Sequence, residues 1–92
     1  MPRFFIEVPH DSDRVACTKA VRIFLSSGSH FLTHADWGCF DGDHHAWLIV
    51  EAADKAEARA IVPPGFRAEA RVVQLNKFEM DKIGGAIRRQ DG

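Results

Sequence analysis

The chain has 92 residues and a mass of 10.3 kDa, the size of one domain with a single modest hydrophobic core. Hydrophobic residues make up 46% and charged residues 27% of it, which excludes a disordered, collagenous or coiled-coil chain. Twelve basic and thirteen acidic side chains leave a net charge of -1, which argues against a partner held mainly by its phosphates. The sequence has no apolar run of the ~18 residues that a membrane span needs and no signal-peptide pattern at its start, so we expect a cytoplasmic protein without a membrane partner.

The first part of the chain predicts a strand followed by a helix. Residues 3–8 are aromatic and β-branched, and Pro9 ends the predicted strand. Apolar side chains in residues 13–27 share one side of a helical wheel, which predicts an amphipathic helix. Asp11 and Ser12 are both of the types that cap a helix N-terminus.

The middle of the chain predicts a hairpin. Residues 30–37 and residues 45–51 both have the composition of strands. The pair Asp41-Gly42 between them is a turn signal, so we expect the two strands to pair antiparallel. The connection is either a two-residue turn at Asp41-Gly42 or a four-residue loop over residues 39–42, and the two alternatives give different registers.

The last part of the chain predicts a short helix, a strand and a second short helical turn. Asp54 is the expected cap of an alanine-rich helix that Pro63 ends. Residues 67–75 predict the fourth strand. Asn76 has capping-box spacing ahead of a turn of helix, and residues 84–92 are expected to form a flexible tail.

The order βαββαβ predicts an α+β domain with the split βαβ arrangement of ferredoxin-like folds. One four-stranded antiparallel sheet then has both helices on one face, and residues 1–92 form a single domain. Alternation along the strands identifies the side chains expected beneath the helices: Phe4, Ile6, Val8, Phe31, Ala35, Trp37, Ala46, Leu48 and Val50. The opposite face is expected to gather Phe5, Leu32, Trp47 and Ile49 with Glu7, His34, Asp36, His45 and Glu51.

This uncovered face predicts a homodimer. Contiguous apolar patches larger than a few hundred Å² normally mark an interface. Covering such a patch contributes about 25 cal/mol per Å², which matters for a small domain. A second copy, packed sheet against sheet across a twofold axis, is the simplest cover.

The length, the βαββαβ order and the part-polar open face resemble the dimeric α+β-barrel superfamily, which includes muconolactone isomerase-like and small monooxygenase-like proteins. The resemblance covers residues 3 to about 83 and concerns architecture, since no catalytic motif of the superfamily matches residue by residue. It implies a dimer with a pocket between sheet and helices or inside the barrel. It implies no single reaction, because this fold supports many.

The candidate catalytic residues are His45, Asp36 and His34. With the two-residue turn, Asp36 lies opposite Trp47 and diagonal to His45, about 7–8 Å away between backbones. Side chains can close that distance, and a carboxylate that fixes one tautomer of an imidazole produces an oriented general base. His34 shares this face and is expected to assist.

The four-residue loop predicts a metal site instead. It brings Asp36 opposite His45 with His34 diagonal, a ligand set that suits Zn²⁺ or non-haem iron. Glu7 on the neighbouring strand is a candidate for a further ligand or base. No spacing in the sequence matches a known zinc motif, so the sequence identifies neither a metal nor a cofactor.

The two cysteines and the remaining histidines are expected to have structural or solvent-facing roles. Cys17 and Cys39 form no CxxC pair and are expected to be reduced and unpaired, with Cys17 on the apolar side of its helix and Cys39 in a turn. His10 is expected to be a solvated loop residue. His44 is expected to be structural or exposed at the end of the hairpin.

Two functions follow from these patterns. The first is a small-molecule enzyme, of isomerase or oxygenase type, whose ligand packs against Trp47, Phe5 and Glu7. The second is a non-catalytic homodimer that binds a ligand, a metal or a protein partner. A nucleic-acid partner is not expected, since acidic residues share the open face and no basic, glycine-rich signature accompanies the aromatic rings.

Overall fold

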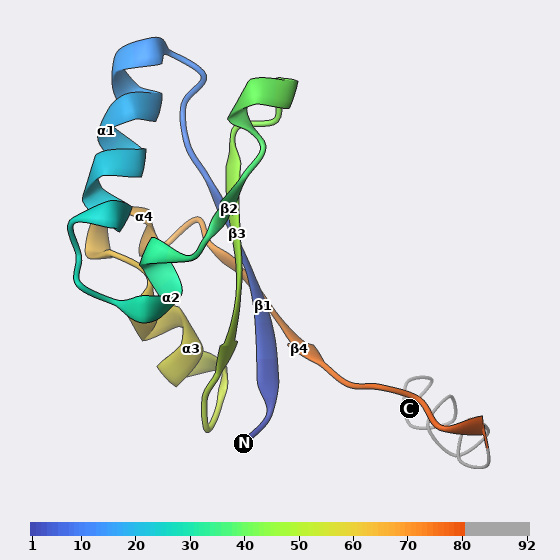
Figure 1. Ribbon diagram of the computed structural model, residues 1–92. Helices are drawn as coiled ribbons and strands as arrows, with labels where there is room; N and C mark the ends of the chain where they lie inside the picture. Colours follow the sequence, from blue (N-terminus) through green and yellow to red (C-terminus); the bar gives the residue numbers. More distant parts are fainter. Residues whose placement is uncertain (81–92) are drawn as a thin grey trace.

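The computed structural model describes residues 1–80, so the tail expected at residues 84–92 lies outside the described residues (Figure 1). A single four-stranded sheet has the spatial order β2-β3-β1-β4, and each neighbouring pair is antiparallel. Its strands are β1 (Arg3–Pro9), β2 (Asp36–Trp37), β3 (His45–Glu51) and β4 (Arg71–Leu75). The chain is therefore an α+β protein with an antiparallel sheet, as the order of elements predicts.

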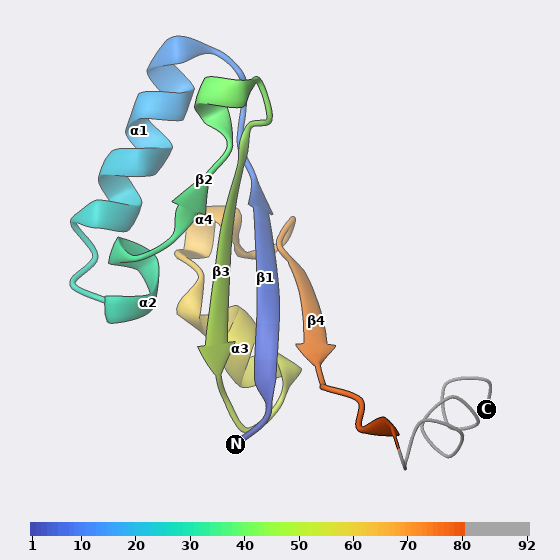
Figure 2. The same cartoon turned by 45° about the vertical axis from the view of Figure 1, so that its right-hand side comes forward.

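The helices all lie on one side of this sheet (Figures 1 and 2). They are α1 (Arg14–Leu25), α2 (His30–Thr33), α3 (Lys55–Ile61) and α4 (Pro64–Arg67), and a 3₁₀ turn η1 (Cys39–Asp41) follows β2. Within residues 1–80 no segment of the chain covers the other face. Among the same residues, none of the helices has the length and apolarity needed to cross a membrane.

The hydrophobic core lies between the helices and the covered face of the sheet. The predicted core side chains of the two central strands are all buried: Phe4, Ile6, Val8, Ala46, Leu48 and Val50. Phe24 of α1 and Val62 after α3 close the core from the helix side, and Phe31, Ala35 and Trp37 pack against it while partly buried. Alternation along β1 and β3 thus predicted the covered face correctly.

The strand predicted at residues 30–37 is wrong over its first half. Ser29 accepts a hydrogen bond from the backbone of Leu32, and Thr33 Oγ1 donates to the Ser29 carbonyl oxygen at 3.0 Å, so the segment forms helix α2. Only Asp36–Trp37 remains as strand β2. Leu32, expected on the open face, is 3% exposed and belongs to the core, because a helix does not alternate its side chains as a strand does.

Three further boundaries differ from the predictions. The cap of α1 is Asp13, whose side chain accepts from the Ala16 amide, and not Asp11 or Ser12. Residues 67–70 belong to α4 and its end, so the fourth strand begins at residue 71. Residues 76–79 are not helical, so the helix expected after Asn76 does not form there.

Candidate metal centre

Four potential metal ligands meet at the end of the sheet where β1 stops and β3 starts. His10 directly follows β1, Cys17 lies on the first turns of α1, Cys39 begins η1, and His44 directly precedes β3. One ligand atom from each residue can be chosen so that all four atoms lie within 4.8 Å of one another. Elements far apart in the sequence therefore supply two imidazoles and two thiols to one place.

The distances among His10, Cys17 and Cys39 are close to those of a tetrahedral zinc site, and the ligand atom of His44 lies within 4.8 Å of all three. His10 Nε2 lies 3.3 Å from Cys17 Sγ and 3.3 Å from Cys39 Sγ, and the two sulfurs are 3.4 Å apart. Zn–S bonds of about 2.3 Å and Zn–N bonds of about 2.0–2.1 Å, set at tetrahedral angles, separate S from S by about 3.8 Å and S from N by about 3.6 Å. Small side-chain movements of a few tenths of an ångström would therefore admit the ion.

Backbone hydrogen bonds fix the segments that supply these ligands. The His10 amide donates to the His44 carbonyl at 3.1 Å, which joins the end of β1 to the hairpin loop. The Cys17 amide donates to the carbonyl of Asp13 at 2.8 Å, in the first turn of α1. Gly42 ends η1 with a φ of +81°, a conformation that glycine adopts without strain. The cluster is thus built on regular structure and on a hydrogen-bonded loop.

The surroundings of two cluster residues, His10 and Cys39, shift their pKa values. All four residues are half-buried. Burial lowers the pKa of His10, and the neighbouring His44 and His45 lower it further, so its ring is in the neutral form that binds metals. Burial raises the pKa of the Cys39 thiol, as does its contact with Cys17. A metal ion that binds Cys39 must therefore displace its thiol proton, so binding releases a proton there.

Two ring nitrogens in the cluster lack partners. His10 Nδ1 and His44 Nδ1 are buried, and neither has a hydrogen-bond partner within residues 1–80. Burying a polar atom without a partner costs on the order of 1–3 kcal/mol. The two rings meet edge to face with their centroids 5.4 Å apart. In His10 the nitrogen that contacts the two thiols is Nε2, so the unpartnered Nδ1 is the ring nitrogen that would not bind an ion there.

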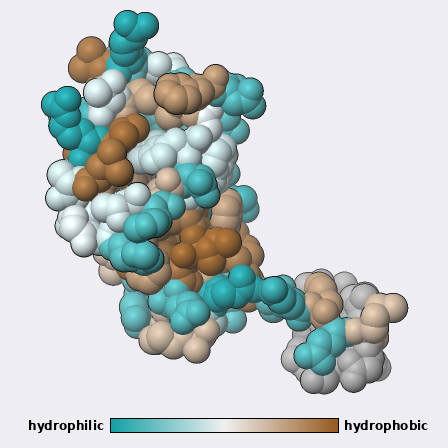
Figure 3. Space-filling view, viewed as in Figure 1, coloured by the Kyte–Doolittle hydropathy of each residue, from teal (hydrophilic) through white to brown (hydrophobic). Residues whose placement is uncertain are grey.

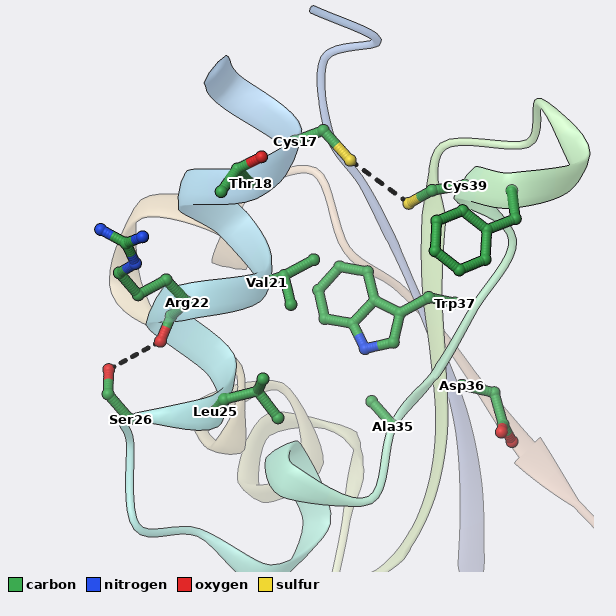
Figure 4. Close-up of a pocket in the computed structure, with 11 residues that line it drawn as sticks. Cys17, Thr18, Val21, Arg22, Leu25, Ser26, Ala35, Asp36, Trp37 and Cys39 are labelled. Carbon is green, nitrogen blue, oxygen red and sulfur yellow. Dashed lines mark hydrogen bonds between the residues drawn. The ribbon is translucent and has the colours of Figure 1, made fainter. Parts of the chain in front are cut away.

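An apolar groove runs from the two cysteines along α1 (Figure 4). Its volume is about 820 Å³, and it separates α1 from β2 and η1. Val21 and Leu25 of α1 point toward Trp37 across it, while Cys17 and Cys39 lie at one end. Val15 and Leu25 of α1 are exposed as well. Hydrophobic patches lie among hydrophilic surface on the face of the molecule seen in Figure 3. The groove thus lies on the helix side of the sheet, one of the two places that the family resemblance implies, and its lining does not include the candidate ligand residues Trp47, Phe5 and Glu7.

The three predicted catalytic residues do not form the expected Asp36–His45 hydrogen bond with His34 beside it. His45 Nδ1 pairs with the carboxylate of Asp43, two residues away, instead of with Asp36. His34 ends α2, where its Nδ1 is 2.9 Å from the carbonyl oxygen of His30, since the helical turn takes it out of strand alternation. Within residues 1–80 no hydrogen bond links any two of His34, Asp36 and His45.

The register expected from the two-residue turn is nevertheless correct. Asp36 pairs with Trp47, although the connection is longer and contains η1. Asp36 itself is exposed. The hairpin therefore has the predicted strand register with a different loop, and that loop supplies two of the four cluster residues.

The predicted ligand-binding residues do share the open face. Trp47 Nε1 donates to Glu7 Oε2 at 2.9 Å, and Arg71 Nε lies 3.4 Å from Glu7 Oε1. The Trp47 hydrogen bond holds the pKa of Glu7 below its usual 4.5, although burial opposes this in part. His45 stacks on the Trp47 ring, with centroids 5.9 Å apart. Phe5 lies on the same face between Ile49 and Val73, its partners on the two neighbouring strands.

Sequence patterns did not group the four cluster residues. Cys17 and Cys39 are indeed unpaired thiols, but their sulfurs touch, and His10 is half-buried instead of solvated. Two thiols and two imidazoles form a donor set that suits Zn²⁺, and four protein ligands fill its coordination sphere. Such a closed arrangement is typical of a structural site. No protein-family model matches the chain, and no curated protein or solved structure matches it either.

Proposed function

We propose that the protein binds one zinc ion through His10, Cys17, Cys39 and His44. The observation that supports this is the convergence of their four ligand atoms within 4.8 Å. Four protein ligands leave no open coordination position, so the ion acts as a structural cross-link and not as a Lewis acid. It would tie the β1–α1 loop to α1 and to the β2–β3 connection.

A metal cross-link suits a chain of this size. Domains of about 90 residues bury a smaller share of their surface than larger ones, and metals often supply part of their stability. A ligand that binds only the folded state stabilises it by about 2.7 kcal/mol when its concentration is 100 times the Kd. The proposed function is therefore that of a zinc-stabilised binding domain, whose apolar groove and open sheet face are held in place by the ion.

Metal analysis and cobalt substitution test the site. We expect purified protein to retain about one zinc ion per chain through dialysis, and chelated protein to bind Co²⁺ with the intense visible bands of tetrahedral thiolate coordination. His44→Asn should weaken binding by about 100-fold or more. The same change at His34, an exposed histidine outside the cluster, is the matched control and should leave binding unchanged.

Loss of zinc during dialysis together with octahedral, thiolate-free cobalt spectra would refute the proposal. Equal effects of the two histidine substitutions would refute it too, since they would mean that histidine content matters and the cluster does not.

A second proposal, independent of the metal, is that the open face pairs two copies of the chain as in a dimeric α+β barrel. It is supported by the apolar side chains on that face, of which Ile49 is 53% exposed and its neighbour Phe5 is half-buried. The order β2-β3-β1-β4 is the one expected of a ferredoxin-like domain, which supports the resemblance. Arg3 and Glu51 are register partners on β1 and β3 at one end of the face. Glu7 and Arg71 form an ion pair toward the other end. Side chains of both charge signs are therefore available to a twofold partner.

Sedimentation at micromolar concentration tests this pairing. We expect about twice the chain mass of 10.3 kDa for the native protein and the chain mass itself for Ile49→Glu. Phe40→Glu, at a fully exposed residue in η1, is the control and should leave the dimer intact. A native protein that sediments as a single chain would refute the dimer. The catalytic role of His45 stays a prediction, checked by loss of turnover in His45→Ala once a substrate is found.

A further inference from the structure

The two cysteines of the cluster are in direct contact. Their sulfurs are 3.4 Å apart, and the two residues lie on α1 and at the start of η1. A disulfide has an S–S bond of about 2.05 Å, so the sulfurs need to approach by about 1.4 Å. A change of side-chain torsion together with a small shift of η1 provides a movement of that size. η1 is a short turn whose Phe40, Asp41 and Gly42 are exposed.

Small reagents can reach both sulfurs. Cys17 and Cys39 are half-buried, and both line the end of the groove between α1 and η1 (Figure 4). Oxidation by a peroxide needs a sulfur that the reagent can reach and that loses its proton to form a thiolate. The groove gives access to both sulfurs, while burial raises the pKa of Cys39 and keeps more of that thiol protonated. Contact between the sulfurs and access from the groove are separate observations, and together they define a pair that can react without unfolding.

We infer that Cys17 and Cys39 are a redox-modification pair, which hydrogen peroxide or another peroxide converts into an intramolecular disulfide. With hydrogen peroxide, one thiol loses its proton, its thiolate attacks one peroxide oxygen, the O–O bond breaks and a sulfenic acid forms, while the departing hydroxide takes up that proton and leaves as water. The second thiol then attacks the sulfenic sulfur, forms the S–S bond and releases a second water. Two electrons pass from the two sulfurs to the peroxide, and the two thiol protons end in the water molecules.

This modification deepens the proposed function, because zinc and the disulfide exclude each other at the same two sulfurs. That competition rests on the proposed zinc site, whereas the formation of the disulfide does not. Thiolate is the form of cysteine that ligates zinc, and a disulfide sulfur is not a thiolate. Oxidation leaves only His10 and His44, and two imidazoles do not make a structural zinc site. The disulfide would replace the metal as a covalent cross-link between α1 and the hairpin.

Peroxide treatment of the chelated full-length protein tests the pair itself. We expect loss of both free thiols without a change in chain mass beyond two hydrogens, and a proteolytic peptide that joins Cys17 to Cys39. His44→Asn keeps both thiols and should form the same disulfide, whereas Cys39→Ser should not. Intermolecular disulfides, sulfinic acids or two surviving thiols in the chelated native protein would overturn the inference.

A zinc-loaded sample separates this inference from the proposed function. We expect bound zinc to slow disulfide formation by about tenfold or more, and oxidation to release the ion to a chromogenic chelator. A disulfide in a protein that never binds zinc would support the redox pair and refute the zinc site. Tight zinc binding without any disulfide in the chelated protein would overturn the redox pair and leave the zinc site standing.

Discussion

Gly38 is the position where one added methyl group should disturb both the open face and the metal centre. A Cβ there would lie 2.6 Å from the backbone carbonyl oxygen of Asp43 and 2.6 and 2.7 Å from two ring carbons of Trp47. Ordinary contacts between such atoms are about 3.5–4.0 Å. Gly38 has a φ of −99°, so the conflict is one of space and not of backbone conformation.

The neighbours of Gly38 cannot move without cost. The Gly38 amide donates to His45, and its carbonyl accepts from the amides of Asp41 and Asp43, so the loop backbone is held in place. Overpacking of this kind costs about 1–3 kcal/mol. If the Trp47 ring swings away, its hydrogen bond to Glu7 is lost as well, which adds about 1 kcal/mol at a half-buried site.

We therefore expect Gly38→Ala to lower the free energy of unfolding by about 2–4 kcal/mol, and the melting temperature by roughly 10–25 °C for a domain of this size. Thermal and urea unfolding followed by circular dichroism measure both. Zinc affinity should fall too, because two ligands, Cys39 and His44, directly follow residues in the clash.

Gly65→Ala is the matched control for this prediction. Gly65 lies in α4 with no atom within 4 Å of an added Cβ, so the substitution should be neutral or stabilise the fold by up to about 1 kcal/mol. A Gly38→Ala protein within about 0.5 kcal/mol of the native one would refute the packing argument. An equal loss at Gly65 would refute it too, since glycine content and not space would then be responsible.

Three further substitutions test the core, a helix cap and the open face. Phe24→Ala should cost about 3–5 kcal/mol because the ring is fully buried, whereas Phe40→Ala at an exposed ring should change stability by less than about 0.5 kcal/mol in denaturant unfolding. Asp54→Ala should cost about 1 kcal/mol, since its carboxylate caps α3, and a loss below about 0.3 kcal/mol would contradict this. The hydrogen bond from the Trp47 indole lowers the pKa of Glu7 in the folded state. The ionised carboxylate therefore stabilises the fold fully at pH values above the usual pKa of 4.5. This stabilisation is lost as the pH falls through the lowered pKa of the folded state. The native protein should therefore lose its stability advantage over Glu7→Gln as the pH falls below the usual carboxyl pKa of 4.5 in pH-dependent urea unfolding, and a difference that stays constant as the solution is acidified would refute the assignment.

The central strands could be predicted because their two faces have different environments. Phe4, Ile6 and Val8 alternate with half-buried residues along β1, and the same alternation in β3 fixes which face the helices cover. A sheet that is buried on one face has apolar residues at every second position of its strands. This pattern can be read from the sequence without knowing which distant residues contact the strand. The register of Asp36 against Trp47 is one of the two that the sequence left open, and the loop that produces it is not the predicted two-residue turn.

The segment before β2 could not be predicted in the same way. Aromatic and β-branched residues at 31–33 favour a strand by composition, and four residues are too few for a helical period to show. The deciding interactions are the cap at Ser29 and the burial of Leu32 in the core, and the second depends on where the rest of the chain lies. Tertiary packing here overrides local propensity.

The candidate metal centre could not be predicted from the sequence, for a related reason. Zinc motifs are recognisable in sequence when two ligands lie a few residues apart on one turn, which fixes their separation locally. Here Cys17 and Cys39 are 22 residues apart, and His10 lies near His44 because β1 ends at the edge of the sheet where β3 starts. The distances between the donor atoms thus depend on the pairing of β1 with β3 and on the position of α1 over the sheet.

This dependence predicts that substitutions which loosen the packing of α1 without changing a ligand, such as Phe24→Ala, weaken zinc binding as well as stability. Substitutions of the ligands themselves should weaken zinc binding more than they lower the stability of the chelated protein.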